Sequence, residues 1–420
     1  MTGRMVAGGG LPRGPIAIVL MTVFLDLMGF GLLIPIQPFY AESFGARPAT
    51  VTLLSATFSL AQFLFAPLVG RLSDRVGRRP VMLLTIAINC AGYLVFGLAG
   101  SLATLFAARI TTGLGSANLG TAQAIMADLT PPEQRARGMG LIGMAFGLGF
   151  IFGPAVGGLL GQYGLAVPAF ASAALAAINF VFAAMLLPET RQSEAGVVAA
   201  DAPSAVRHRL SLAALGEAVR RPGVAQLFWL SLVGTIAFSQ MEQVLGLYIE
   251  RTWLTDGSPA PSSTDHLRAA AALTAYFLIV VGVAIAFVQG LLIGRLARWL
   301  GEPRLLQIGT FITAVGLALV PVVGDLRIFG VFLLLGPLLA LGTGLTHPSL
   351  TSLLSKAAPS SGVGGMLGLG QSLSALGRVV GPSLAGVLFE VHRGVPFWVG
   401  AAMMLTCTAV AMTLSISRTH

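Results

Sequence analysis

Long apolar runs recur along almost the whole chain, and they constrain the fold more than any other feature. Each run is about 20 residues long, which is the length an α-helix needs to cross the hydrocarbon core of a bilayer. Only 10% of the 420 residues are charged and 55% are hydrophobic, whereas a soluble domain carries about 25% charged residues. The composition excludes a water-soluble enzyme and predicts an all-α polytopic membrane protein embedded in the lipid bilayer.

Breaks in hydropathy divide the sequence into twelve transmembrane helices. The longest polar segment separates six spans from six. We therefore expect an N-terminal six-helix bundle over 1–187, a cytoplasmic central linker over 188–223 and a C-terminal six-helix bundle over 224–420. The predicted spans are 16–38, 50–70, 81–99, 102–124, 138–161, 167–187, 224–249, 268–294, 305–323, 328–352, 361–389 and 395–416.

Basic residues are distributed unevenly between the two sides of the predicted membrane. The tails and loops on the side of the N-terminus hold 18 Lys and Arg residues, and the opposite loops hold five. Cytoplasmic loops carry the excess of positive charge, so both termini and the central linker are expected to be cytoplasmic. The basic residues then act as orientation signals, and no nucleic acid partner is expected. Arginine outnumbers lysine 24 to 1, which favours a bacterial inner membrane.

Two glycine motifs of the first half return in the second half, at offsets of 224 and 228 residues. Transporters are commonly built from structural repeats, so the two six-helix bundles are expected to be pseudo-symmetric. The motifs are Gly70-Arg71-Leu72, matched by Gly294-Arg295-Leu296, and Gly149 with Gly153-Pro154 and Gly158, matched by Gly377 with Gly381-Pro382 and Gly386.

The loop after the second span is rich in arginine and reads GRLSDRVGRRP, from Gly70 to Pro80. It resembles the G-x-L-x-D-R-x-G-R-[RK] signature of the major facilitator superfamily, with which the twelve spans and the halved repeat agree. In that family the loop is a cytoplasmic latch, whose charges pair in one conformation and hydrate in the other. Arg298 stands in the place of Asp74 in the second copy, so the second latch is expected to be degenerate. The resemblance implies a cytoplasmic gate of Gly70, Asp74, Arg75, Gly77 and Arg78, with Asp128 as a partner for Arg78.

The fifth span contains a second motif, GLGFIFGPAVGGLLG, from Gly147 to Gly161. Small residues at such spacing suit a close-packing helix face. The run also resembles the G-x-x-x-G-P-x-x-G-G motif of antiporters, which implies export and a kinked hinge at Gly149, Gly153, Pro154, Gly157 and Gly158. The segments 25–38 and 109–120 are similar to the first and fourth helices of tetracycline and multidrug:proton antiporters. The resemblance is therefore to the twelve-helix drug:proton antiporter branch.

Five ionisable residues fall inside predicted spans: Asp26, Arg109, Glu242, His347 and Arg378. A charge at bilayer depth costs at least ~2.5–3.5 kcal/mol on insertion scales, so such residues usually face the protein interior or water and serve function. The family resemblance implies a cavity lined by the first, fourth, seventh and tenth helices. Each of those four helices carries one of these residues.

Asp26 and Arg109 are the candidates for proton coupling. The proton affinity of a carboxylate rises with desolvation and falls beside a cation, so changing water access or shifting Arg109 would load and release a proton at Asp26. The alternative is a static Asp26–Arg109 pair that only fixes the first helix against the fourth.

The other intramembrane residues keep two interpretations each. Glu242 either attracts a cationic substrate or takes a second proton, or it is inert and hydrated near the periplasmic mouth. His347 is a relay or a helix-packing hydrogen bonder, and Arg378 either binds an anionic group or neutralises Glu242. Helical spacing adds polar neighbours on the same faces. The predicted substrate cavity comprises Gln37, Thr112, Ser116, Gln123, Thr235, Glu242, His347, Gln371 and Arg378.

These residues predict a proton-coupled secondary active exporter of amphipathic small molecules, such as tetracycline-like drugs, that works by alternating access. The proton gradient supplies the energy, so no cofactor or metal is expected. The sequence contains neither a G-x-x-x-x-G-K-[ST] loop nor an H-E-x-x-H motif, and enzymatic activity is not expected. The family resemblance implies a monomer. The alternatives are an exporter of an endogenous lipid, sugar or siderophore-like metabolite, and a non-transporting membrane sensor.

Overall fold

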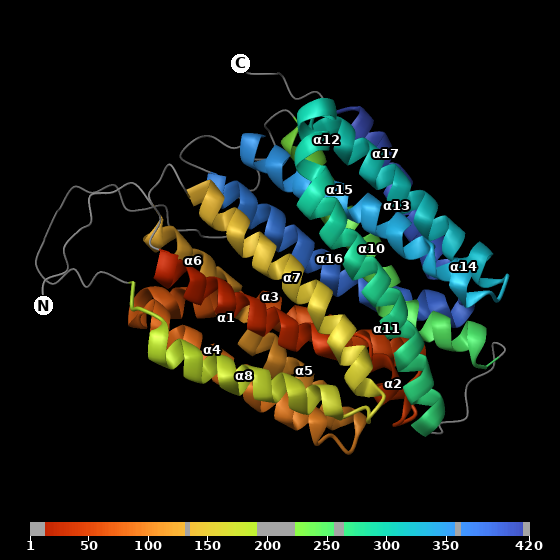
Figure 1. The fold of residues 1–420 in the computed structure, drawn as a ribbon, viewed down its shortest axis with the longest axis horizontal. Helices are drawn as coiled ribbons and strands as arrows, with labels where there is room; N and C mark the ends of the chain where they lie inside the picture. Colours follow the sequence, from red (N-terminus) through yellow and green to blue (C-terminus); the bar gives the residue numbers. More distant parts are fainter. Residues whose placement is uncertain (1–12, 131–134, 191–222, 256–263, 358–362, 415–420) are drawn as a thin grey trace, which may run out of the picture.

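The computed structural model of the chain describes residues 13–130, 135–190, 223–255, 264–357 and 363–414 (Figure 1). Throughout these ranges the regular structure is helical and contains no strand, which confirms the all-α prediction. Among the described residues, eleven helices are long and apolar enough to cross a membrane. The predicted central linker falls mainly on 191–222, which lies outside the described residues.

The fourth predicted span is a broken helix. Helix α5 (Leu102–Gly115) leads into a 3₁₀ turn, η1 (Ser116–Asn118), and the chain continues as α6 (Leu119–Leu129). The α5 and α6 segments have 14 and 11 residues, and a spanning helix needs about 20 residues. The three pieces therefore cross together and complete the twelve spans.

The remaining helices follow the predicted spans. In the first half they are α1 (Arg13–Leu33), α2 (Gln37–Glu42), α3 (Pro48–Val76), α4 (Arg78–Gly97), α7 (Arg135–Gly161) and α8 (Val167–Leu186). In the second half they are α10 (Val224–Trp253), α11 (Thr264–Phe287), a π-helical turn η3 (Val288–Leu292), α12 (Ile293–Leu300), α13 (Glu302–Gly324), α14 (Phe329–Leu333), α15 (Leu335–Ala357), α16 (Val363–Val391) and α17 (Val395–Met412).

Local sequence accounts for several helix ends. Pro48 begins α3, where its missing N–H costs no hydrogen bond. The Ser101 hydroxyl caps α5 by accepting a hydrogen bond from the Thr104 N–H at 3.3 Å. Gly77, with φ 118°, separates α3 from α4, and Gly301, with φ 77°, separates α12 from α13. Both glycines adopt backbone angles that other residues rarely take, so the two halves turn the chain in the same way at equivalent positions.

The helices form two bundles, which Figure 1 shows in red to yellow for the first half and green to blue for the second. Two seams join the bundles, because α3 packs on α16 and α7 packs on α11. We call the end that carries α2 the α2 end, and the end that carries the Gly70–Pro80 loop the latch end. At the α2 end, Ser55 Oγ donates a hydrogen bond to Gln243 Oε1, and Ala49 N donates to Glu390 Oε1 at 3.3 Å. The halves are therefore held together at the α2 end.

Candidate functional site

Asp26 lies near the middle of α1 and is held by amides from two other elements. Asn89 Nδ2, on α4, donates a hydrogen bond to Asp26 Oδ1 at 2.7 Å. Asn118, in the η1 turn, is a second hydrogen-bond partner of this carboxyl group, and Ser116 Oγ donates to Asn89 Oδ1 at 3.3 Å. The break in the fourth span thus brings the amide of Asn118 to Asp26, the one acidic residue of α1, and the hydroxyl of Ser116 to Asn89.

Arg109 occupies an aromatic cage on α5. Its guanidinium carbon lies 6.0 Å from the Phe30 ring centre, 5.5 Å from that of Phe58 and 5.3 Å from that of Phe96. Such cation–π contacts stabilise a desolvated cation by about 2 kcal/mol. The residue is 3% exposed, and its Nε and Nη1 atoms have no hydrogen-bond partner in the described structure. The structure therefore does not bring Arg109 and Asp26 into the static ion pair considered above.

The other predicted cavity residues of the first half take different positions. Gln37 falls within the first predicted span, but α1 ends at Leu33 and Gln37 begins α2, where its Nε2 donates to Ser55 Oγ at 2.6 Å. Thr112 is fully buried, and its side chain contacts the backbone of Gly92 in the packing of α4 against α5. Ser116 lies in η1, and Gln123 is half-buried on α6.

Three charged or titratable residues gather in the second half. Glu242 lies on α10, His347 on α15 and Arg378 on α16, and the charge of Arg378 acts on both of the others. The His347 ring also meets Phe238 edge-on, with 6.3 Å between the ring centres. Thr235 is buried against Gly377, whereas Gln371 is exposed on α16. The helices therefore bring Glu242, His347 and Arg378 into one electrostatic cluster.

The glycines of the fifth-span motif press α7 against α1. An added Cβ would lie 2.7 Å from Leu27 Cβ at Gly149, 2.7 Å from Gly31 Cα at Gly153, and 2.1 Å from the Leu32 carbonyl oxygen at Gly157. Pro154 lies in the same contact, with its Cδ beside Gly31. Gly158 faces the opposite way, toward Ala275 of α11 in the other half. The motif thus packs α7 onto the helix that carries Asp26 and onto the seam between the halves.

The second copy of the motif makes the equivalent contacts in the second half. Gly377 and Gly381 pack on α10, and Gly386 crosses the other seam to contact Thr52 and Ala49 of α3. In each half the helix of the fifth span therefore packs on the first helix of its own half and also contacts the opposite half. These helices are α7 and α16.

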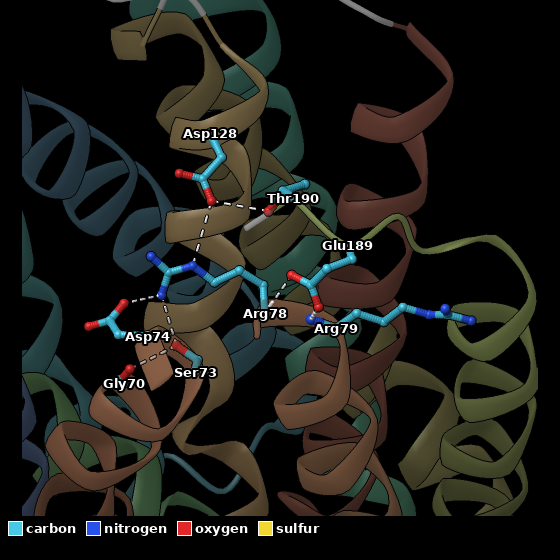
Figure 2. A network of polar contacts seen from close by, with 8 residues as sticks. All are labelled: Gly70, Ser73, Asp74, Arg78, Arg79, Asp128, Glu189 and Thr190. Carbon is cyan, nitrogen blue, oxygen red and sulfur yellow. Dashed lines mark hydrogen bonds and ion pairs between the residues drawn. The ribbon is translucent and has the colours of Figure 1, made fainter. Parts of the chain in front are cut away.

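The latch-end loop is organised around Arg78, the first residue of α4 (Figure 2). Arg78 Nε lies 3.5 Å from Asp128 Oδ2, and Nη1 donates to Ser73 Oγ at 2.9 Å and contacts Asp74. Thr190 Oγ1 also donates to Asp128 Oδ2, at 3.0 Å. The arginine thus ties the end of α3 to the end of α6.

Glu189, which the sequence analysis did not single out, caps the start of α4. Its carboxylate accepts hydrogen bonds from the backbone N–H groups of Arg78 and Arg79, at 2.9 and 3.2 Å (Figure 2). A negative charge at a helix N-terminus is favoured by the helix dipole. A Cβ at Gly77 would lie 2.6 Å from Glu189 Oε2, so the glycine of the motif also leaves room for this cap.

The second latch departs from the motif at Arg298, as expected, but it keeps one ion pair with inverted polarity. Arg298, Glu302 and Lys356 occupy the places of Asp74, Arg78 and Asp128, and Glu302 forms an ion pair with Lys356. Glu302 is the first residue of α13, as Arg78 is of α4, and Lys356 ends α15, as Asp128 ends α6. The expected degeneracy was based on Arg298 alone and did not consider Glu302 and Lys356. The structure shows that an ion pair with opposite polarity is kept at the equivalent place.

Replacing Arg78 with glutamine is expected to lower the free energy of unfolding by about 1–2 kcal/mol, because hydrogen bonds to a charged group are lost. Thermal unfolding of the purified protein measures this change. The matched control is Arg71→Gln, since Arg71 is exposed and its Nε donates only within α3, to the Pro67 carbonyl. Equal melting temperatures for the two variants would contradict the assignment of a special structural role to Arg78.

Comparison with known proteins agrees with this architecture. The family model described as Major Facilitator Superfamily matches residues 19–382. The chain is 29% identical over 408 residues to the class E tetracycline resistance protein of Escherichia coli, covering 96% of this chain and 94% of that protein. It is 28% identical to multidrug resistance protein 2 of Bacillus subtilis, with 94% of each chain covered.

Among solved structures, the human organic anion transporter MFSD10 (TETRAN) superposes with a TM-score of 0.68 at 25% identity, covering 95% of this chain and 99% of that one. The family model, the curated relatives and this structure extend over nearly the whole sequence and agree on one fold. The chain is therefore a multi-pass membrane transporter and belongs to the Major Facilitator Superfamily.

Proposed function

We propose that this transporter is a proton-coupled exporter of amphipathic drugs such as tetracycline-like compounds. It exchanges protons for drug across a bacterial inner membrane, as a monomer with both termini in the cytoplasm. The relatives are named for resistance to tetracycline and to multiple drugs, and export is the direct way for a transporter to confer such resistance.

The observation that carries the proposal is the setting of Asp26. Its carboxyl group lies in a membrane-spanning helix and is held by Asn89 and Asn118. Arg109 is caged by aromatic rings and forms no ion pair with it in the described structure. A carboxylate without a fixed counter-cation changes its charge when water access changes. Asp26 is therefore suited to bind a proton on one side of the membrane and release it on the other.

Alternating access follows from the arrangement of the halves. Cross-half hydrogen bonds and glycine contacts hold the α2 end together, so we assign the structure to a state that is closed at the α2 end. We expect the substrate to bind between Asp26 in the first half and the Glu242, His347 and Arg378 cluster in the second. Opening the α2 end while closing the latch end moves the cargo outward.

A second cargo class is an endogenous metabolite that carries an anionic group. Arg378 lies within electrostatic reach of Glu242 and His347 but forms no direct ion pair among the described residues. A similar fold belongs to a protein named as an organic anion transporter. An organic anion that pairs with Arg378 is therefore the alternative to an amphipathic drug.

The test is a transport assay in liposomes that enclose a pH-sensitive dye. Purified protein is reconstituted, a pH gradient is imposed, and tetracycline, a lipophilic cation or an organic anion is added separately. Proton flux that depends on tetracycline or the cation supports drug antiport, whereas flux with the anion alone supports the second cargo class. Folded protein that gives no flux with any of them would overturn proton-coupled export of these cargos and leave an exporter of another endogenous metabolite, or a non-transporting sensor, as the alternatives.

A further inference from the structure

Four ionisable side chains from both halves meet at the α2 end. Arg251 Nη2, on α10, lies 3.1 Å from Glu42 Oε1, on α2, and His266 Nε2, on α11, lies 3.3 Å from Glu250 Oε1. The side chains of Glu42 and Glu250 are 12% and 1% exposed. None of these residues belongs to the substrate cavity or the latch, so the proposed function does not explain why such charges are buried.

The two carboxyl groups face each other across the boundary between the halves. Glu42 and Glu250 lie within hydrogen-bonding range of one another. As charged carboxylates they can only accept hydrogen bonds. Glu250 Oε2 and Glu42 Oε2 have no hydrogen-bond partner in the described structure, and Glu250 Oε1 has only the 3.3 Å contact with His266 Nε2. Buried polar atoms are nearly always hydrogen-bonded. One proton on either carboxyl group supplies the missing donor and lets each group bond the other.

The charge balance leads to the same result. With His266 neutral, two carboxylates and one arginine leave a net negative charge in a buried place, whereas one added proton makes Glu42, Glu250 and Arg251 neutral as a set. A proton on His266 would balance the charge equally, and the His266→Gln variant below separates the two cases. Burial and the nearby Glu250 raise the pKa of Glu42 from its ordinary 4.5 to about 8, although Arg251 acts in the opposite direction. The closed α2 end therefore favours the state in which the two carboxyl groups share one proton.

We propose that Glu42 and Glu250 form a proton-binding site that locks the α2 end closed. With one proton shared between them, the two carboxyl groups hydrogen-bond across the halves and Arg251 balances the remaining charge. After the proton leaves, two like charges from opposite halves repel each other and gain hydration when the α2 end opens. The site controls the conformational equilibrium and does so whatever the cargo is.

The other charged groups at this end have partners or lie in water. Arg393 Nη2 pairs with Asp325 at 3.0 Å and Nη1 donates to the Arg251 carbonyl oxygen at 3.3 Å, and Arg268 pairs with Asp265 at 3.4 Å. Glu390 accepts the hydrogen bond from Ala49 N and is exposed. His266 contacts Glu250 directly, so it is the one further group whose titration must be separated from that of the carboxyl pair. The described charged and titratable residues around the pair are Arg47, Asp265, His266, Arg268, Asp325, Arg327, Glu390, His392 and Arg393.

The direction of the pH effect follows from the two conformations. Opening the α2 end would hydrate Glu42 and return its pKa toward the ordinary 4.5, whereas burial and the nearby Glu250 raise that pKa to about 8 in the closed state. The closed state therefore binds the proton more tightly. The stabilisation of the closed state over the open state by the proton is complete below pH 4.5. Between pH 4.5 and 8 the ratio of closed to open molecules falls by up to about tenfold per pH unit, and above pH 8 this stabilisation is gone.

The test measures distances between the halves in lipid nanodiscs as a function of pH. Spin labels are placed at Tyr163→Cys and Leu326→Cys, two exposed positions on opposite halves at the α2 end, in a chain with Cys90 and Cys407 replaced by alanine. A second pair, Val76→Cys and Trp299→Cys, reports the latch end. We expect the α2-end distance to lengthen as the pH rises from 5 to 9, while the latch-end distance shortens.

Isosteric variants assign this transition to the carboxyl pair. Glu42→Gln and Glu250→Gln each remove the charge and keep a hydrogen-bonding group, so the α2 end is expected to stay closed at every pH. Glu390→Gln, at the same end but exposed, should keep the wild-type transition, and so should His266→Gln. A transition that survives in both Glu42→Gln and Glu250→Gln, or that disappears in His266→Gln, would overturn the proposal, as would a wild-type distance that does not change with pH.

Discussion

Asp26→Asn is expected to reduce proton-driven drug efflux to the rate seen in protein-free liposomes, while drug binding to the purified protein is retained. Asparagine keeps an oxygen that accepts the hydrogen bond from Asn89 Nδ2, which lies 2.7 Å from Asp26 Oδ1. It cannot take up a proton, so the coupled step is lost without a change of shape. The measurement compares dye-reported proton flux with equilibrium binding of tetracycline to the same preparation.

The matched control for this variant is Asp265→Asn. Asp265 lies in the first turn of α11, is exposed and pairs only with Arg268 among the described residues, so its loss should leave efflux and binding unchanged. Full efflux by Asp26→Asn would place the coupling proton elsewhere. Loss of efflux together with loss of tetracycline binding would show that Asp26 serves the cargo and not the proton.

Gly157→Ala is expected to cause a large loss of stability. The added Cβ would lie 2.1 Å from the carbonyl oxygen of Leu32 and 2.6 Å from its Cα, which are backbone atoms that no side-chain rotation can move aside. Overpacking of this kind costs about 1–3 kcal/mol or more. The melting temperature in detergent and the monodisperse fraction after purification measure the effect.

Gly143→Ala is the control within the same helix, because no atom outside the helix lies within 4 Å of the position where its Cβ would be. Alanine is the better helix former, so this variant should be at least as stable as the wild type. If both variants melt at the same temperature, the contact between α7 and α1 is looser than the structure indicates.

Long-range architecture could be predicted from the sequence because the bilayer simplifies the pattern. A spanning helix requires a run of about 20 apolar residues. A duplicated six-helix unit repeats its motifs at nearly the same offset, here 224 and 228 residues. The glycine motifs around Gly153 and Gly381 therefore indicated equivalent helices before any contact was known. In the structure they pack on α1 and α10, which are equivalent first helices of their halves.

Breaks inside spans could not be predicted, because hydropathy averages over them. Ser116–Asn118 is too short to interrupt the apolar run, yet it ends α5 and brings Asn118 to Asp26. Gln37 was placed on α1 for the same reason. A helical spacing argument assumes one continuous helix, and the chain turns after Leu33.

The partners of charged residues depend on tertiary packing. Contacts between distant segments cannot be predicted from the pattern of a single sequence. Glu42 and Glu250 lie at the ends of apolar runs, where a sequence pattern cannot tell hydrated charges from charges buried between the halves. The lone amide of Asn89 in an apolar span was a usable signal for a partner of Asp26. Glu189, at the end of another span, gave none until its contact with the start of α4 was seen.

The charges at the two ends of the molecule respond to different properties of the solution. Within the latches, Arg78 pairs with Asp74 and Asp128, and Glu302 pairs with Lys356, and salt screens interactions between exposed charges over about 8 Å at physiological ionic strength. The side chains of Glu42 and Glu250 at the α2 end are buried, and buried charges are screened much less. Ionic strength therefore acts mainly on the latches, while proton concentration acts on the proposed lock at the α2 end.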